Sequence, residues 1–459
     1  MPHGLDVGPQ CPGGAAAVKP PPGMTFGQLG PVVGRAGLVT SALFAAGLRS
    51  WSPAVVAAGP GTSAWLGAGL PQAAADLEVG MSHPVIARSQ TRNMALDQLA
   101  AMLRDQSARQ LDVIAGAGAI RLVGGRLLLE GTEPELGPDG VTMTAGRYAV
   151  NEVANAGLAD KLGIPAAYLR RLHADHPDLY DQNVNGWLDR TDRRFLVRVL
   201  RGEAGGGVVR AFLSDRYSRI DNLDVLMAVL DGVRRSGAQV QVDGCDLTER
   251  RMHVRLYAPQ VRALAPQLLG SYRSPFDGRP GADLPVVWAG FVISNSETGC
   301  GAFTIAPRLV VEVCRNGMVI DHAGLRRTHL GARHSDDGVV AWSQETTSKT
   351  LDLIASRTRD AVAAYLDADF VTRTVRALEA VAATPVSDPD ITIKQLGQRL
   401  RYTEEQQRGL LAHFIAGADL SAGGILHAVT SLAQTLPDAD AAYELEATAV
   451  HAMRIAAGR

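Results

Sequence analysis

In the middle of the 459-residue chain, apolar and polar residues alternate with a period of two, which is typical of strands that bury one face. The clearest pair is "RRFLVRVL" (Arg193–Leu200) and "VVRAFLS" (Val208–Ser214), which predicts a first hairpin. The next segment, "LDVLMAVLDGVRRSG", has helical spacing, with Asp221 or Asn222 as a cap and Gly237 as a stop. "AQVQVDGCDLTERRMHVRLYAP" and "VVWAGFVISNSETGCGAFTIAPRLVVEVCRNGMVI" predict two further hairpins. A hairpin, a helix and more antiparallel strands predict an α+β core.

Shorter signals precede this core. The segment "AIRLVGGRLLLEG" predicts a hairpin that turns at Gly124-Gly125. In "LADKLGIPAAYLRRL", a small helix ends at Gly163 and Pro165 opens a second helix, which carries Arg170 and Arg171. This pattern is typical of a DNA-recognition helix-turn-helix or of a helical hairpin packed on the sheet.

Beyond about residue 338 the spacing of apolar residues is helical. Residues 339–383 predict one long or two consecutive amphipathic helices, and Thr403 and Gln406 have the spacing of a capping-box pair. We therefore expect an α+β fold, with a helical N-terminal subdomain, an antiparallel hairpin and helix core, and a helical C-terminal region.

The first 80 residues differ from the rest. They are rich in Gly, Ala and Pro, carry few charges and show no sustained periodicity. Either they form a disordered leader, or the start codon lies too far upstream and Met81 is the first residue. The expected organisation is this leader at 1–80, an α/β and helical subdomain at 81–190, the antiparallel core at 191–335 and the helical region at 336–459.

Charge is unevenly distributed along the chain. The net charge is −2, but residues 189–333 hold 21 Arg, no Lys and 15 acidic residues. Arginine suits bidentate contacts to phosphate, although a GC-rich genome, in which Arg replaces Lys, is a sufficient explanation.

The four cysteines form no C-x-x-C pair, so we expect no zinc site, disulfide framework or cofactor. The longest apolar run, Ala36–Leu48, is too short to span a bilayer, and we expect a cytoplasmic protein without membrane contact.

The stretch "SNSETGCGAF" (Ser294–Phe303) allows three interpretations: a phosphate-binding loop, a cysteine site or a hairpin turn. A phosphate loop needs a strand that leads into a helix N-terminus, and here strands lie on both sides. No pattern places a His or Asp beside Cys300. Asn295, Ser296 and Gly299 are turn formers, so the sequence favours a hairpin turn.

Several motifs together resemble a known family. "RAFLSDRYSRIDNLDVL", "FVISNSETGCGAFTIAPRLVVEVCRNGMV" and "RRTHLG", with "LGIPAAYLRRL...NVNGW" and "ILHAVTSLAQ", are similar to the phage/plasmid-like family catalogued as domain of unknown function 932. The resemblance covers roughly residues 90–455. It implies a protein of phages, plasmids and integrated elements, with a core distantly similar to Rad-type single-strand annealing proteins. That analogy implies single-stranded DNA as the partner, and a homo-oligomer.

A single-strand binding or annealing protein needs a basic groove for phosphates and aromatic faces for bases, without a cleaving centre. Candidate contacts are the basic and aromatic residues of the first hairpin, of "DRYSRI" and of "RRTHLG": Arg193, Arg194, Arg198, Arg210, Arg216, Tyr217, Arg219, Arg326 and Arg327. If Arg194, Leu196 and Arg198 share a face, that face is partly basic and the opposite one is buried. The alternative for each arginine is a solvated strand edge.

Two other functions remain open. A metal-dependent DNA-processing enzyme would use histidines and carboxylates around "RRTHLGARH": His322, His329, His334, Glu297, Asp336 and Asp337. Their spacing matches no compact metal-ligand pair, so we expect no catalytic residues and no metal. A counter-defence factor that binds a host protein would suit the neutral charge and the helical tail equally well.

Overall fold

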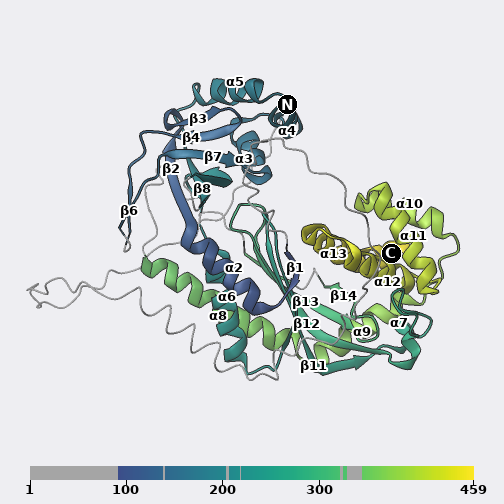
Figure 1. Cartoon of the computed structure of the whole chain (residues 1–459). Helices are drawn as coiled ribbons and strands as arrows, with labels where there is room; N and C mark the ends of the chain where they lie inside the picture. Colours follow the sequence, from purple (N-terminus) through teal and green to yellow (C-terminus); the bar gives the residue numbers. More distant parts are fainter. Residues whose placement is uncertain are drawn as a thin grey trace, which may run out of the picture. The chain divides into compact units, whose positions relative to one another are not determined.

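The computed structural model describes residues 91–137, 140–202, 206–217, 219–320, 324–327 and 344–458 (Figure 1). The expected leader at 1–80 and the alternative start at Met81 lie outside these residues. The described chain has the expected α+β class, with strands and helices intermixed up to residue 327 and helices alone after residue 344. None of the helices in the described segments is long and apolar enough to cross a membrane.

The larger sheet, sheet A, contains the second and third predicted hairpins. Its strand order is β1-β10-β11-β12-β13-β14, β15 also pairs with β13, and all these pairs are antiparallel. The strands are β1 (Thr91–Met94), β10 (Gln241–Leu247), β11 (Met252–Leu264), β12 (Val286–Asn295), β13 (Phe303–Val311), β14 (Gly317–Val319) and β15 (Leu325–Arg327).

Sheet B contains the first predicted hairpin and has the order β2-β8-β9-β7-β4-β3. Its strands are β2 (Gln110–Gly116), β3 (Ile120–Val123), β4 (Arg126–Leu129), β7 (Gly146–Val150), β8 (Arg194–Arg201) and β9 (Gly207–Ser214). All pairs are antiparallel except β7 and β9, which run parallel. The boundary expected at residue 190 therefore falls inside one sheet, because β8 and β9 complete a sheet begun by earlier strands. A separate ribbon pairs β5 (Glu135–Gly137) with β6 (Gly140–Thr142).

The predicted turn of β3 and β4 is confirmed by its backbone. Gly124 and Gly125 form the turn, with φ values of 62° and 71°. Two consecutive residues with positive φ are what a two-residue hairpin turn of type I′ requires, and glycine adopts this conformation without steric cost.

Three helices pack on sheet B: α3 (Glu152–Leu162), α4 (Ala166–Asp175) and α5 (Pro177–Leu188). Helix α3 ends at Gly163 in the left-handed conformation. It approaches β9 so closely that a Cβ on Gly157 would lie 2.4 Å from the carbonyl oxygen of Phe212. The segment is therefore a helical hairpin packed on a sheet, the second of the two alternatives, and Arg170 and Arg171 are exposed on α4.

The remaining helices pack mainly around sheet A and one another. They are α2 (Leu96–Arg109), α6 (Asn222–Ser236), the short α7 (Pro266–Leu269), α8 (Gln344–Tyr365), α9 (Ala368–Ala382), α10 (Pro389–Leu400), α11 (Glu404–Gly417), α12 (Ala422–Thr435) and α13 (Ala439–Ala456). Single turns of 3₁₀-helix occur at Ala117–Ala119 and Gly281–Asp283. Of the two options for residues 339–383, two helices are present, and the Thr403 and Gln406 capping box is confirmed.

Helices α6 and α8 cross at a glycine, which gives a first prediction. A Cβ on Gly232 would lie 2.4 Å from the carbonyl oxygen of Ala355. Gly232→Ala should therefore lower the free energy of unfolding by about 1–3 kcal/mol, although alanine is the better helix former by about 1 kcal/mol. Urea unfolding measures it, with Gly118→Ala, where the added Cβ meets open space, as control. An unchanged or stabilised Gly232→Ala protein would contradict this close crossing.

Candidate functional site

The stretch "SNSETGCGAF" connects β12 to β13, whose pairing reaches Ser294 and Thr304, so the hairpin turn is confirmed. The turn is not solvated, however. Asn295, Ser296, Glu297 and Thr298 are all buried, as few hairpin turns are. Buried polar groups need partners, and the partners of this turn come from distant parts of the chain.

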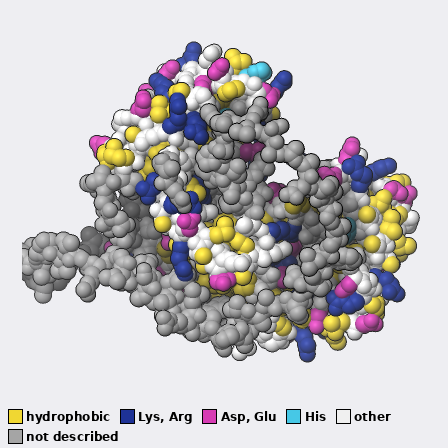
Figure 2. All heavy atoms as spheres, in the orientation of Figure 1, with side chains coloured by type: hydrophobic (Ala, Val, Ile, Leu, Met, Phe, Trp, Pro, Cys, Tyr) yellow, Lys and Arg dark blue, Asp and Glu magenta, His cyan; other side chains and the backbone are white. Residues whose placement is uncertain are grey.

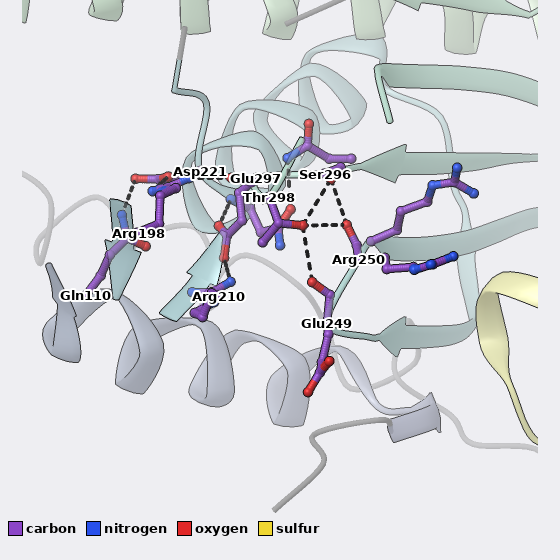
Figure 3. Close-up of polar contacts among 12 residues, drawn as sticks. Gln110, Arg198, Arg210, Asp221, Glu249, Arg250, Ser296, Glu297 and Thr298 are labelled. Carbon is purple, nitrogen blue, oxygen red and sulfur yellow. Dashed lines mark hydrogen bonds and ion pairs between the residues drawn. The ribbon is translucent and has the colours of Figure 1, made fainter. Parts of the chain in front are cut away.

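Glu297 is the charged residue at the tip of this turn, with 5 % of its surface exposed. One carboxylate oxygen accepts a hydrogen bond from the Arg210 guanidinium, and the other accepts one from the backbone N–H of Asn222 at 2.8 Å. Its carbonyl oxygen accepts a hydrogen bond from Arg198 at 2.6 Å. Figure 3 shows Glu297 between these groups of sheet B and α6. We call these contacts the Glu297 junction.

The ionisation of Glu297 follows from these contacts. Burial alone would raise the pKa of its carboxyl, but the charges of Arg210 and Arg198 and the Asn222 N–H outweigh burial. The pKa of Glu297 therefore lies below its usual value, and the carboxylate stays charged. Asn222 is also the first residue of α6, whose N-terminal N–H groups favour an anion.

Arg198 supplies the second half of the junction. Its guanidinium donates to both carboxylate oxygens of Asp112, at 2.9 and 3.0 Å, and to Asp221 at 2.6 Å. Burial would lower the pKa of Arg198, but the two carboxylates raise it above its usual value. Asp221 precedes α6 without capping it through its side chain, because its carboxylate binds Arg198. Gln110 donates to both Asp112 and Asp221, at 3.2 and 3.3 Å.

The rest of the turn is bound to the neighbouring β10–β11 turn. The hydroxyl of Ser296 donates to the carbonyl of Arg250 at 2.7 Å, and that of Thr298 donates to the carbonyl of Glu249 at 3.1 Å (Figure 3). The N–H of Cys300 donates to the Ser296 hydroxyl at 2.9 Å. Burial raises the pKa of the Cys300 thiol, which keeps it protonated near neutral pH and disfavours its use as a nucleophile.

Two of the predicted DNA contacts are therefore corrected. Arg198 is 2 % exposed, and the Arg210 side chain is 14 % exposed with its guanidinium bound to Glu297, so the charges of both are paired within the fold. The opposite face, with Phe195, Val197 and Val199, is buried as expected. The arginine-bearing face is not an exposed basic face, however, because Leu196 and Arg198 on it are buried as well. The β12–β13 turn covers it: a Cβ on Gly299 would lie 2.6 Å from a methyl group of Leu213, the residue opposite Leu196.

The other predicted contacts have different positions. Arg219 is exposed but contacts Asp112 at 3.1 Å, and the Tyr217 hydroxyl donates to the Ser296 carbonyl at 3.2 Å. Arg193, Arg194 and Arg216 are exposed. Because Phe195 pairs with Ser214, these three arginines emerge at the same end of β8 and β9. Arg326 and Arg327 lie on β15 opposite Thr304 and Phe303, and their side chains are outside the described part of the chain.

Most residues of the metal-site hypothesis lie outside the described segments, so it stays a hypothesis. The described segments contain no group of three or more His, Cys, Asp or Glu side chains arranged to hold a metal ion. Glu297, one of its carboxylates, is bound to arginines. Its other residues, His322, His329, His334, Asp336 and Asp337, lie outside the described residues. A pocket of about 10 Å³ beside Glu297, lined in part by Gln106, Gln110 and Leu223, has room for about one water molecule.

Sequence reasoning missed the acidic partners of the buried arginines. Asp112 lies in "QLDVIAG" and Arg198 in "FLVRVL", both flanked by apolar residues. A charge inside such a strand requires an opposite charge, so the two strands together carried a signal for this pair. A second buried pairing joins Arg308 to Asp243 and Glu446, at 2.7 and 2.6 Å, and connects α13 to sheet A. Sequence reasoning missed it too, because the partners are far apart in the sequence.

Comparison of the chain with protein-family models, with curated proteins and with solved structures finds no match in any of the three. The resemblance to the phage/plasmid-like family and the analogy with annealing proteins therefore stay predictions.

The Glu297 junction predicts a large loss of stability on neutralising its carboxylate. Glu297→Gln keeps the size of the side chain but leaves Arg210 and Arg198 without this buried counter-charge. We expect the free energy of unfolding to fall by about 3–5 kcal/mol, measured by urea denaturation. Glu444→Gln is the control, because Glu444 forms an exposed ion pair with Arg251, and it should cost less than about 1 kcal/mol. Equal effects of the two variants would show that the junction contributes little to stability.

The same carboxyl gives a prediction for pH. The pKa of Glu297 is lower in the folded than in the unfolded protein, where it is about 4.5. Its stabilising effect is therefore fully present above the unfolded pKa and is lost as the pH falls through the folded one. The difference in unfolding free energy between wild type and Glu297→Gln should be largest at neutral pH and shrink below about pH 4.5. Urea midpoints between pH 7 and pH 3 test this, and a difference that grows towards acid would refute it.

Proposed function

We propose that this chain binds single-stranded DNA at the exposed end of sheet B and does not cleave it. The supporting observation is that the exposed residues Arg193, Arg194 and Arg216 all lie at that end of β8 and β9. None of the three forms an ion pair with an acidic side chain in the described segments, so their charges are available to phosphate. Arg193 instead donates to the carbonyl of Lys161 at 3.1 Å and lies 5.4 Å from the ring centre of Phe195.

Aromatic side chains accompany these arginines. Trp187, in the last turn of α5, is 48 % exposed and precedes Arg193 by six residues. Tyr168 on α4 is 47 % exposed, and its hydroxyl accepts a hydrogen bond from Asn183 of α5 at 3.3 Å. Since Leu179, Asn183 and Trp187 follow at four-residue spacing, they share one face of α5, about 12 Å long. Stacking on such rings is how proteins hold unpaired bases without reading their sequence.

The surface charge around this site is positive but modest. Asp189, at the end of α5, is paired with Arg121 at 2.8 Å, while Asp192 and Asp215 are exposed next to the arginines. Figure 2 shows hydrophobic, basic and acidic side chains together over α4 and α5 at the top of the view. We therefore expect moderate affinity that depends strongly on salt.

The family resemblance extends this proposal to biology. We infer a mobile-element protein that anneals complementary strands during recombination and acts as a cytoplasmic homo-oligomer. The resemblance alone supports the annealing and the oligomer, and both are testable with the purified chain by strand-annealing rates and by light scattering.

A salt series with a matched pair of variants tests the proposed site. We expect Arg193, Arg194 and Arg216→Ala together to weaken binding of a fluorescent oligodeoxythymidylate at least about 10-fold. The slope of log affinity against log salt should fall by about 2, since each phosphate contact on a single strand contributes about 0.7. Arg198 and Arg210 are left intact because their loss would disturb the fold.

The control carries the same change of charge elsewhere: Arg373, Arg376 and Arg399→Ala, all exposed on α9 and α10. Its affinity and salt slope should stay close to those of the wild type. If the two triple variants lose affinity equally, binding is not localised to sheet B. If the wild type binds no oligonucleotide even at low salt, the proposal fails, and the exposed face of α5 becomes a candidate surface for a protein partner.

A further inference from the structure

A second surface with aromatic and basic side chains lies on sheet A. Tyr257 of β11 and Trp288 of β12 are stacked, with ring centres 5.1 Å apart and ring planes inclined by 15°. Tyr257 pairs with Gly290, so Tyr257 and Trp288 belong to the same face of the sheet. The hydroxyl of Tyr257 donates to Gln241 at 2.6 Å, while part of Trp288 remains exposed.

Arg315, in the turn between β13 and β14, lies over both rings. Its guanidinium carbon is 5.0 Å from each ring centre, and it donates to the Tyr257 hydroxyl at 3.2 Å. The residue is exposed and has a φ of 61°, in the left-handed region that glycine adopts at lower cost. The backbone of the turn therefore does not favour arginine at this position. What arginine adds here is a guanidinium group held over the two rings.

A second arginine flanks the same tryptophan. Arg262 of β11 is directly opposite Trp288 in the register, so the two side chains share one face. Arg262 is exposed and has no hydrogen-bond or ion-pair partner among the described residues. Of the nearby acids, Asp243 is bound to Arg308, and Glu312 lies in the same turn as Arg315. Arg308 is also shared with Glu446, so acidic groups lie close to this surface. Arg262 and Arg315 are nevertheless both exposed, so each can reach a phosphate or a base.

We propose that these four residues, Tyr257, Trp288, Arg262 and Arg315, form a second contact site for single-stranded DNA, which we call the aromatic–arginine patch. The Arg315 guanidinium, supported by the two rings, presents its outer plane to a base, as arginine does in single-strand recognition. Arg262 binds an adjacent phosphate through its planar fork. This assignment rests on the proposed function for its class of ligand, but its residues belong to the other sheet.

The fluorescence of Trp288 provides a local readout. The chain has five tryptophans, and Trp187 belongs to the first proposed site. In the full chain carrying Trp187→Phe, pentathymidylate should quench tryptophan fluorescence, and adding Trp288→Phe should abolish most of that quenching.

In the same background, Arg262→Ala and Arg315→Ala should each weaken pentathymidylate binding about 5- to 10-fold, the scale of one lost base or phosphate contact. Arg373→Ala on α9 is the control and should change nothing.

The outcomes separate this inference from the proposed function. If quenching persists without Trp288, or if Arg262→Ala and Arg315→Ala bind like the control, the aromatic–arginine patch is not a DNA contact, whether or not sheet B binds. Loss of affinity in the sheet A variants, with no effect of the sheet B triple variant, would support the patch and reject the first site. Binding of free thymidylate as tightly as the pentanucleotide would identify a mononucleotide ligand and overturn the strand assignment.

Discussion

The packing of sheet B against sheet A depends on one buried carboxylate. Glu297 lies at the tip of a hairpin of sheet A and is held by Arg210 and Arg198 of sheet B and by the first N–H of α6. A charge in this position is stable only because all of these partners are present, since a buried ion without them would cost several kcal/mol. The hairpin, the sheet B strands and the start of α6 must therefore fold into one register together.

This constraint determines which basic residues of the first hairpin stabilise the fold and which remain available to a ligand. Arginines in a strand can serve a ligand or the fold, and the carboxylate partners of Arg198 and Arg210 assign these two to the fold. The arginines that remain for a ligand are exposed and take no part in the Glu297 junction. They are Arg193, Arg194 and Arg216 at the end of sheet B, and Arg262 and Arg315 on sheet A. Arg315 lies over the partly exposed Trp288, and single-stranded nucleic acid binds to such combinations of basic and aromatic side chains.

The sequence predicts the local elements of this fold well because their signals are local. The glycine pair of the β3–β4 turn, the Thr403 capping box and the glycine after α6 each act within a few residues. The pairing of Asp112 with Arg198 or of Arg210 with Glu297 joins residues 86 and 87 positions apart, and no local pattern specifies it. For the same reason sheet B could not be anticipated, since β2, β3, β4 and β7 join a hairpin that follows them by three helices. The exposed candidates Arg193, Arg194 and Arg216 were predicted as basic residues of the first hairpin and of the "DRYSRI" segment after it. Arg262 and Arg315 become visible only through the strand register.

Amide hydrogen exchange of the full chain, with and without saturating oligodeoxythymidylate, tests most directly the claim that exposed rather than buried arginines contact DNA. If the exposed arginines of sheet B contact DNA, amide exchange around residues 187–194 and 215–217 should be slower in the bound protein. Exchange in the Ser296–Cys300 turn should stay unchanged, because its polar groups are already bonded within the protein. Protection confined to that turn would contradict this claim. So would a bound protein without protection around residues 187–194 and 215–217.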